Sequence, residues 1–550
     1  MNRLLIVILA AMLSASTRAQ FSIEGREVAY DSLSHTLLAT IPQHLYGSDL
    51  NARISIHDDC TLLMINGQVI SDSYHFSNLS PTHRYMTSLA MSDGRIISGN
   101  IMFTTLPIVQ LKGTFGYDYA EGQLLVMNPD SLTTETFVPQ IKWRGGTTNA
   151  YDRHKRNYKI KLPEDHSFFG LRDDNNWLLD AGQADVFRLR NLIANEIWND
   201  FATKPYYADK KQKARSCISG QVVEVFLNDE YRGVYAFTEN LDRKQMKLKK
   251  LDAETGQVHG CLWKAKSHTM AAVFGGYYND YDNLSETWEG FEAKYPDLSD
   301  LDSTDWSTLV SAIEFSARSS NEDFVVQYAD YFDEPVVIDY FIFQNALSAA
   351  DNNGKNMFWA VYDKATDKKI TPAVWDLDCT AGQRWVTKYN SDAVKPDYRI
   401  EYSTTLVERL LYELQHKDFT QKTIDRYRQL RQNVFSTDSL CSRYRYYRQL
   451  LQQCGADKRE TARWSGDSDI DGEPIDFDAE TDYICNWIGQ RMAYLDQCFD
   501  EMDNSLGISS PLQQQADTRV YTITGQQVSS QTMNRRRGIY IKNGHKYIIR

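Results

Sequence analysis

Residues 351–382 constrain the fold more than any other stretch, because polar residues there surround two short apolar runs. The runs at 357–362 and 370–375 favour β-strands, and the charged residues between them favour a loop. The stretch therefore predicts an antiparallel hairpin. Residue 366 lies midway between Asn356 and Asp376, so a symmetric hairpin would set these side chains side by side, with Cβ atoms about 5 Å apart.

Acidic and amide side chains are expected to meet at one end of this hairpin. They are Asp351, Asn356, Asp376 and Asp378, with Lys355 beside them. Three carboxylates in one place repel each other unless a cation lies among them. Oxygen ligands without His or Cys favour Mg²⁺ or Mn²⁺ over zinc. The alternative is that Asp and Asn simply collect at hairpin ends and helix caps.

The spacing of these residues points to phosphoryl transfer. Asp351 and Asn356 have the D-x4-N spacing of a protein-kinase catalytic loop, in which Asp orients the acceptor hydroxyl and Asn holds a metal. An Asp after a hairpin then takes the place of the metal-binding Asp. The D-x-D of Asp376 and Asp378 also fits a nucleotide-sugar glycosyltransferase, although the D-x4-N spacing and a glycine-containing loop upstream count against it.

That upstream loop joins two strands predicted at 138–143 and 158–162. Glycines and small hydroxyl residues between strands allow backbone N–H groups to approach phosphates closely. A plain hairpin turn has the same composition, so both interpretations stay open. The predicted nucleotide-binding residues of the loop are Arg144, Gly145, Gly146 and Thr147.

Further candidates lie on the elements around this loop. Lys159 and Lys161 point to one face of the second strand, and one of them is expected to contact a phosphate while the other is solvated. A helix predicted at 186–199 carries three candidates for facing the site, Arg188, Asn191 and Glu196. Glu239 follows a hairpin strand where a kinase hinge would contact adenine; alternatively it caps a helix.

The chain is expected to be exported. Residues 1–19 have the pattern of a signal peptide, and no other stretch reaches about 18 apolar residues, so no transmembrane anchor is predicted. The formal net charge of −13 disfavours binding to nucleic acid or anionic lipid. Eight scattered cysteines without a C-x-x-C pair argue against a zinc motif.

The order of elements predicts an α+β chain of several parts. A small all-β, sandwich-like module is expected at 20–105, because β-favouring runs there are punctuated by turn residues. The main domain follows at 106–505, with an acidic, mostly helical region at 275–335, a helix at 335–350 and further helices after residue 404. The stretch 456–477 is expected to be an exposed loop or lid. A linker at 506–517 precedes a basic β tail at 518–550.

Residues of about 106–500 resemble the CotH kinase family of secreted atypical protein kinases. The resemblance rests on Arg144 to Thr148, on the run KRNYKIKL at 155–162, on Leu227-Asn228, Gly233-Val234-Tyr235 and Glu239, on Asp351 with Asn356, and on Trp375 to Asp378 with Gly382. It implies a bilobal kinase-like fold, ATP with Mg²⁺ or Mn²⁺, and transfer of phosphate to Ser or Thr of an exported protein substrate.

The resemblance also implies roles for single residues. Asp351 is similar to the catalytic Asp; Asn356, Asp376 and Asp378 to the metal ligands; and Lys161 or Lys159 to the phosphate-contacting lysine. The resemblance also implies an acidic partner for that lysine, for which Glu196 is the candidate. The chain departs from the family pattern at Thr147-Thr148, where serines are usual, and at Ala381, where an aromatic residue is usual. These departures bear on how the nucleotide would be held.

The final residues resemble the C-terminal sorting domains of type IX secretion, through VYTITGQQV and GIYIKNGHKYIIR. This implies contact with secretion machinery and an extracellular or cell-surface location, with the periplasm as the other possibility. A non-catalytic surface protein on a kinase-like scaffold remains an alternative. It would bind carbohydrate or protein through the β module and aromatic residues such as Tyr277, Tyr278 and Tyr281.

Overall fold

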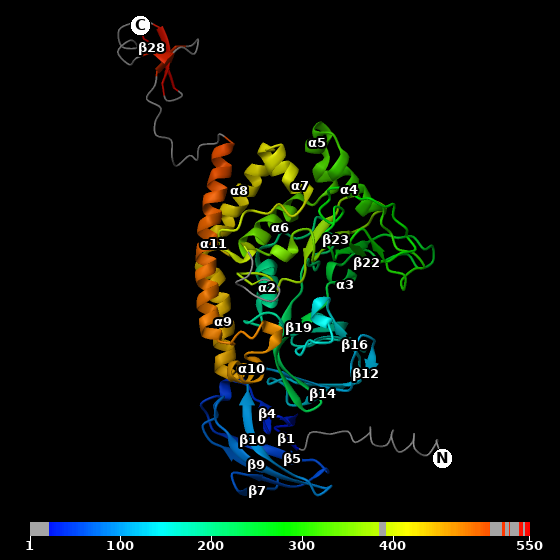
Figure 1. The fold of residues 1–550 in the computed structure, drawn as a ribbon, viewed down its shortest axis with the longest axis vertical. Coiled ribbons are helices and arrows are strands. Elements are labelled where there is room, and N and C mark those ends of the chain that lie inside the picture. The colour runs from blue at the N-terminus through cyan, green and yellow to red at the C-terminus, as the bar shows by residue number, and fades with distance from the viewer. Residues whose placement is uncertain are drawn as a thin grey trace.

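A computed structural model describes residues 21–383 and 392–506, and in the C-terminal part the strands at 520–522, 527–528, 538–542 and 545–549. The predicted signal peptide at 1–19 lies outside the described residues. Helices and sheets both contribute, which agrees with the α+β class (Figure 1). The strands of the C-terminal part form one sheet, in the order β26 (Gln527–Val528), β25 (Val520–Thr522), β27 (Gly538–Lys542) and β28 (His545–Ile549).

Residues 21–104 form two sheets around one apolar core. The smaller sheet has the order β2 (Arg26–Glu27), β1 (Phe21–Ile23), β5 (Leu50–Ile56), β8 (Ser73–Phe76). The larger has the order β3 (Ala29–Asp31), β4 (Thr36–Thr40), β10 (Ile96–Thr104), β9 (Tyr85–Met91), β6 (Cys60–Ile65), β7 (Gln68–Ile70). A short 3-10 helix, η1, covers Gln43–Leu45. Alternate residues of β9 are buried, as expected for strands that present one face to a core.

These two sheets are packed firmly against the next part of the chain. Leu38 and Met102 share an apolar cluster with Ile108, Met127 and Phe226 of the following sheet. The β module therefore packs against the main domain through buried apolar surface and is not joined to it by a linker alone.

A nine-stranded sheet follows at 108–239. Its order is β12 (Ala120–Glu121), β15 (Gln140–Arg144), β16 (Asn157–His166), β17 (Asp174–Asp180), β19 (Glu230–Glu239), β18 (Gly220–Leu227), β11 (Ile108–Lys112), β13 (Gln123–Met127), β14 (Thr134–Phe137). The alternation predicted for β16 is confirmed, since Tyr158, Ile160 and Leu162 are buried in one core while Lys159 and Lys161 take the other face. Helix α2 (Arg190–Phe201) packs its apolar residues against β18 and β19.

A five-stranded sheet contains the predicted hairpin. Its order is β21 (Thr287–Trp288), β22 (Phe291–Tyr295), β20 (Cys261–Ala265), β23 (Met357–Val361), β24 (Thr371–Val374). The β23–β24 hairpin is confirmed, but Met357 pairs with Val374, so its register differs by one residue from the symmetric one. Asn356 and Asp376 both have left-handed backbones, with φ of 50° and 58°, and leave the ladder instead of facing each other across it.

Helices make up the rest of the main domain: α3 (Arg243–Met246), α4 (Ser307–Arg318), α5 (Asn321–Tyr331), α6 (Glu334–Leu347), α7 (Thr405–Glu408), α8 (Lys417–Arg431), α9 (Thr437–Cys454), α10 (Ala456–Trp464), α11 (Phe477–Ser505). A π-helical turn, η5, continues α7 over Arg409–Glu413, and 3-10 turns cover η2 (Thr147–Asn149), η3 (Ala350–Asn352), η4 (Asp392–Val394) and η6 (Ser468–Ile470). Helices α9 and α11 run side by side along one edge (Figure 1). None of the helices within the described residues is both long and apolar enough to span a membrane.

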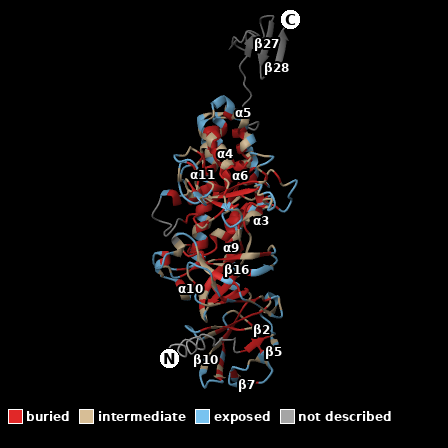
Figure 2. Ribbon diagram, turned by 90° about the vertical axis from the view of Figure 1, so that its right-hand side faces the viewer, coloured by how far each residue is buried: buried red, intermediate tan, exposed pale blue. Residues whose placement is uncertain are grey.

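Helix α6 positions the candidate site. Every residue from Val336 to Leu347 is buried, which places α6 in the interior shown red in Figure 2. A helix enclosed on all sides in a close-packed interior has little freedom to shift. The turn η3 that follows it, and Asp351 within that turn, therefore have a fixed support.

Two local predictions were wrong. Strands β21 and β22 occupy part of the region 275–335 that was expected to be mostly helical. Residues 456–464, expected in an exposed loop, form α10, in which Glu460 is fully buried. Glu460 is buried because two cations meet it there: Lys155 Nζ lies 3.1 Å and Arg188 Nε 2.7 Å from its carboxylate.

Candidate active site

The carboxylate of Asp351 is buried and held by three hydrogen bonds. Lys355 Nζ donates to both of its oxygens, at 2.9 and 3.0 Å, and Asn356 Nδ2 donates at 2.7 Å. His268 Nε2 lies 3.7 Å away. Asp351 is thereby oriented as an acceptor, with the D-x4-N residues in direct contact.

Asp376 and Asp378, which follow β24, are enclosed with other negative charges. The pKa of Asp376 is raised, chiefly by burial, although the positive charges of Lys264 and Arg144 oppose the shift. The pKa of Asp378 is raised well above its usual value by burial and by the charges of Asp376 and Asp180. Asp351 contributes to both shifts, so the structure brings the predicted acidic residues into one neighbourhood.

Asp180 is a member of this acidic cluster that the sequence pattern did not single out. It ends β17, and Asn191 Nδ2 of α2 donates a hydrogen bond to its carboxylate. Asn191 Oδ1 accepts the Leu377 N–H at 2.9 Å. Helix α2 therefore joins Asp180 to the segment that carries Asp376 and Asp378. The available signal was that Asp180 ends a strand shortly before a helix that was expected to face the site.

Asn352 ties the two halves of the site together. Its Nδ2 donates to the carbonyl oxygens of Asn356, at 2.9 Å, and Trp375, at 2.7 Å. Tyr340 of α6 donates its hydroxyl to the Asn352 carbonyl at 2.9 Å. One buried amide thus fixes the segment after Asp351 against the segment before Asp376.

Replacing Asn352 with Ala is expected to lower the free energy of unfolding by about 1–3 kcal/mol, because two buried carbonyl groups lose their donor. Binding of metal and nucleotide should weaken too, since the two acidic segments are no longer joined. Urea unfolding measures the first effect and calorimetry the second. Asn353→Ala, at the neighbouring half-buried position, is the matched control, and an equal loss in both variants would contradict this role.

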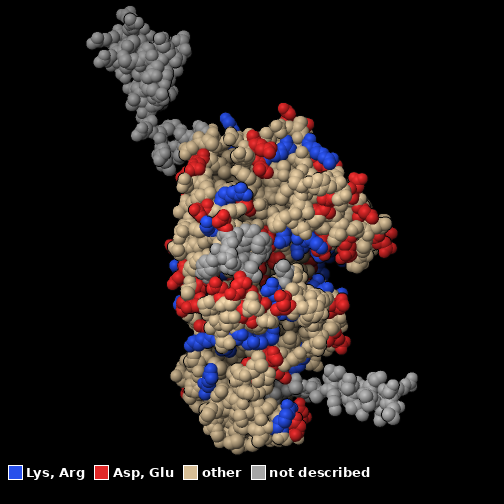
Figure 3. Space-filling view, viewed as in Figure 1, with Lys and Arg blue, Asp and Glu red and all other residues tan. Residues whose placement is uncertain are grey.

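Basic side chains face the acidic cluster from two sheets. Arg144 at the end of β15 and Lys264 of β20 lie over the Trp375 ring, at 5.5 and 5.6 Å from its centroid. Burial and the charges of Lys294, Lys142 and Arg144 lower the pKa of Lys159 to about 8, whereas Lys161 is exposed. Lysine and arginine gather at the hollow in the middle of the surface in Figure 3. A small pocket beside Asp376 is lined by Arg144, Leu178, Asn191, Ile218, Thr238 and Trp375.

The comparisons with known proteins agree with this geometry. A family model described as CotH kinase protein matches residues 141–495. The chain belongs to the CotH kinase family. The match begins in β15 and ends in α11, so it includes Asp351 and the hairpin. It also includes Arg144, Lys159 and Lys264, which together form the basic face of the site. A search of curated proteins found no match.

The loop predicted to hold phosphates lies directly beyond Arg144 in the CotH kinase region. Gly145 has φ of 114°, and a Cβ there would meet Thr148 Oγ1 at 1.9 Å, so this position needs glycine. Gly146 follows, and Thr147 opens the turn η2. Asn157 Nδ2 lies 3.4 Å from Thr148 Oγ1, which links the loop to the start of β16. The loop is next to the basic face without being part of the acidic cluster.

Two glutamates have surroundings different from those expected for a nucleotide site. Glu239 accepts hydrogen bonds from Arg215, from the Ser219 N–H at 2.9 Å and from Gln245 Nε2 at 2.9 Å, so its carboxylate is already occupied. Glu196 accepts from the Tyr447 hydroxyl of α9. It is therefore not the partner of a β16 lysine. Among the described residues, Lys155 and Glu460 form a buried lysine–glutamate pair.

In the part of the chain that the structure describes, one group of three His, Cys, Asp or Glu side chains brings ligand atoms within 4.8 Å of one another, namely His154, Asp467 and Asp469. Arg153 Nη1 lies 3.7 Å from Asp469 and competes with a cation there. Among the described residues, Asp376 and Asp378 do not belong to any group of three whose ligand atoms lie within 4.8 Å of one another. Binding a cation among them requires their carboxylates to draw closer together.

Proposed function

We propose that this CotH kinase is an exported atypical protein kinase that transfers the terminal phosphoryl group of ATP to Ser or Thr of an exported protein. One observation carries the proposal: the hydrogen-bonded Asp351–Asn356 pair lies in the same neighbourhood as Asp376 and Asp378, and the basic side chains Arg144 and Lys264 lie next to Asp376. Export is supported by the signal-peptide pattern at 1–19 and the sorting-like tail at 518–550.

The donor set fits a hard divalent cation. Asp376, Asp378 and Asp180 supply half-buried carboxylates whose mutual repulsion a cation would relieve, and Asn356 supplies an amide oxygen. Mg²⁺ or Mn²⁺ held there would neutralise charge on the phosphate oxygens and lower the barrier to transfer.

The chain's own side chains take the remaining tasks. Asp351, oriented by Lys355 and Asn356, accepts the hydrogen bond of the acceptor hydroxyl and aligns it for attack. Arg144, Lys264 and Lys159 provide positive charge where the phosphates would lie. Lys159 is preferred over Lys161 for this contact because it is the more buried and lies among the other cations.

Calorimetry of ATP binding to the mature chain tests the proposal. We expect binding with Mg²⁺ or Mn²⁺ and little binding with EDTA, followed by incorporation of labelled phosphate into an exported acceptor protein. Absence of ATP binding with either metal would contradict the kinase and favour a non-catalytic surface protein. Metal-dependent binding of a nucleotide sugar in place of ATP would instead favour a glycosyltransferase.

Divalent metal binding is expected to release protons and to become tighter as pH rises. Raised pKa values mean that Asp376 and Asp378 keep a proton to higher pH in the folded chain than in the unfolded chain. A cation binds only the ionised carboxylates and must displace that proton. Titration with Mg²⁺ in two buffers of different ionisation enthalpy, at mildly acidic and mildly alkaline pH, measures the release. Heats independent of the buffer at both pH values would contradict it.

A further inference from the structure

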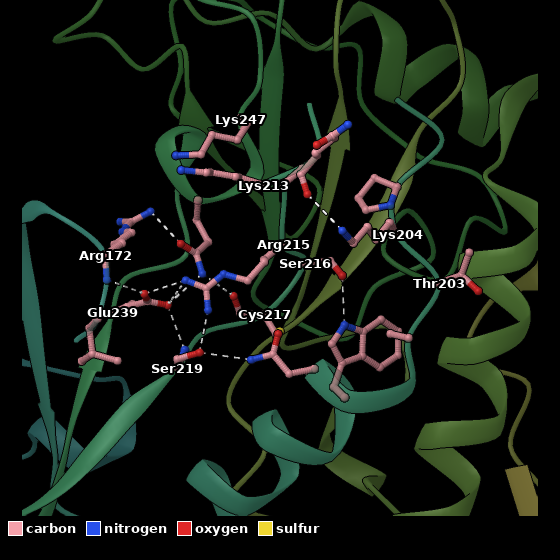
Figure 4. Close-up of a pocket in the computed structure, with 18 of the residues that line it drawn as sticks. Arg172, Thr203, Lys204, Lys213, Arg215, Ser216, Cys217, Ser219, Glu239 and Lys247 are labelled. Carbon is pink, nitrogen blue, oxygen red and sulfur yellow. Dashed lines mark hydrogen bonds and ion pairs between the residues drawn. The ribbon is translucent and has the colours of Figure 1, made fainter. Parts of the chain in front are cut away.

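A second cavity, of about 650 Å³, lies apart from the acidic cluster. Its walls come from the end of α2, the loop at 203–219 and the segment that follows β19 (Figure 4). Ile218 faces the small pocket beside Asp376, whereas its neighbours Cys217 and Ser219 line this cavity. Five basic side chains line it: Arg172, Lys204, Lys213, Arg215 and Lys247.

Two of these cations are already compensated within the protein. Arg215 Nη2 lies 2.6 and 2.7 Å from the two carboxylate oxygens of Glu239, which also lines the cavity. Arg172 donates to both oxygens of Asp242, at 3.0 and 2.9 Å. Because Arg215 already balances the negative charge of Glu239, this carboxylate does not compensate the lysines of the cavity.

Lys213 and Lys247 are not compensated in this way. Among the described residues, no carboxylate oxygen lies within 4.0 Å of either ammonium group. The two side chains lie side by side in Figure 4 and extend in the same direction. Burial and the positive charges of Arg172, Lys213 and Arg215 lower the pKa of Lys247, although the negative charge of Asp242 opposes the shift. Lys204 Nζ donates to the Gln212 carbonyl, at 3.1 Å. A chain with net charge −13 thus carries a pocket with an excess of positive charge.

We propose that this cavity binds a phosphate monoester carried on an organic group. The dianion would lie between Lys213 and Lys247, which supply the two positive charges that it needs. The volume exceeds what phosphate alone requires and is in the range of pockets for organic ligands. Ala202, Pro205 and Cys217 give an apolar wall for the organic part. Among the described residues that line the cavity, Glu239 is the one carboxylate and it is paired with Arg215, so the lining does not fit a second nucleotide–metal site.

Calorimetry of the full chain in EDTA tests this proposal separately from the kinase proposal, because metal-dependent ATP binding is absent. The probes are inorganic phosphate, O-phosphoserine, and a short peptide with and without phosphoserine. We expect the phosphorylated probes to bind and their affinity to fall at least about tenfold in Lys213→Ala/Lys247→Ala, since two charge-assisted bonds are lost. Lys211→Ala/Lys250→Ala, at exposed positions outside the cavity, and Asp378→Asn should leave the affinity unchanged.

The probes also distinguish the sources of the ligand. Tighter binding of the phosphopeptide than of O-phosphoserine supports a phosphorylated protein segment, and equal binding supports a small phosphate ester. Equal binding of the unphosphorylated peptide, binding unchanged in the Lys213/Lys247 variant, binding of inorganic phosphate alone, or no binding of any probe would overturn the proposal. Thermal unfolding of both double variants establishes that they are folded.

Discussion

Asp378→Asn is expected to weaken Mg²⁺-dependent ATP binding by at least about 100-fold, because even residues that only support metal ligands change metal affinity by about 10–100-fold. Asn keeps the size of the side chain but removes one of the charges that the cation must meet. The loss should come with no decrease in thermal stability of the metal-free chain. The pKa of Asp378 is raised because its charge is buried beside Asp376 and Asp180, so a neutral amide removes repulsion.

The two readouts together separate a metal ligand from a structural residue. Calorimetry with ATP and Mg²⁺ gives the affinity, and thermal unfolding in EDTA gives the stability. Asp280→Asn, at an exposed position, is the matched control and should change neither. Retained ATP affinity in Asp378→Asn, or a large fall in melting temperature without metal, would show that Asp378 serves the fold and not the cation.

Local patterns in the sequence were sufficient to predict the hairpin and many helices. Strands β23 and β24 are short apolar runs around a charged loop, and such a pattern depends on neighbours in the chain. The one-residue difference in register has a local cause that composition does not reveal. Asn356 and Asp376 turn out of the ladder with left-handed backbones, so the strands end before the residues that were expected to pair.

The parts of the site that could not be predicted come from distant segments. Lys264 reaches Trp375 from β20, and Asp180 reaches Asp378 from the end of β17, through sheet pairings that no short window of sequence contains. Asn352 lies within the predicted motif, but its role depends on the Trp375 carbonyl, which only the folded hairpin brings within reach. Glu460 was assigned to a loop because the buried cations that balance it are far away in sequence.

Asp351→Asn is expected to lower the rate of phosphoryl transfer by about 10²–10⁴-fold, the usual contribution of a positioned proton acceptor, while ATP affinity changes little. The carboxylate of Asp351 is held by Lys355 and Asn356 and is therefore directed by protein donors. An amide has the same shape but cannot take the proton of the acceptor hydroxyl. Single-turnover transfer of labelled phosphate and calorimetry of ATP binding measure the two quantities on the same protein.

Asp367→Asn, in the loop that joins β23 to β24, is the matched control on the same hairpin and should leave both quantities unchanged. A parallel loss of ATP binding and transfer in Asp351→Asn would make Asp351 a metal ligand, and undiminished transfer would remove it from the chemistry. Loss of transfer with retained ATP binding is the result that requires Asp351 to act on the acceptor hydroxyl, because Asp378→Asn loses both together.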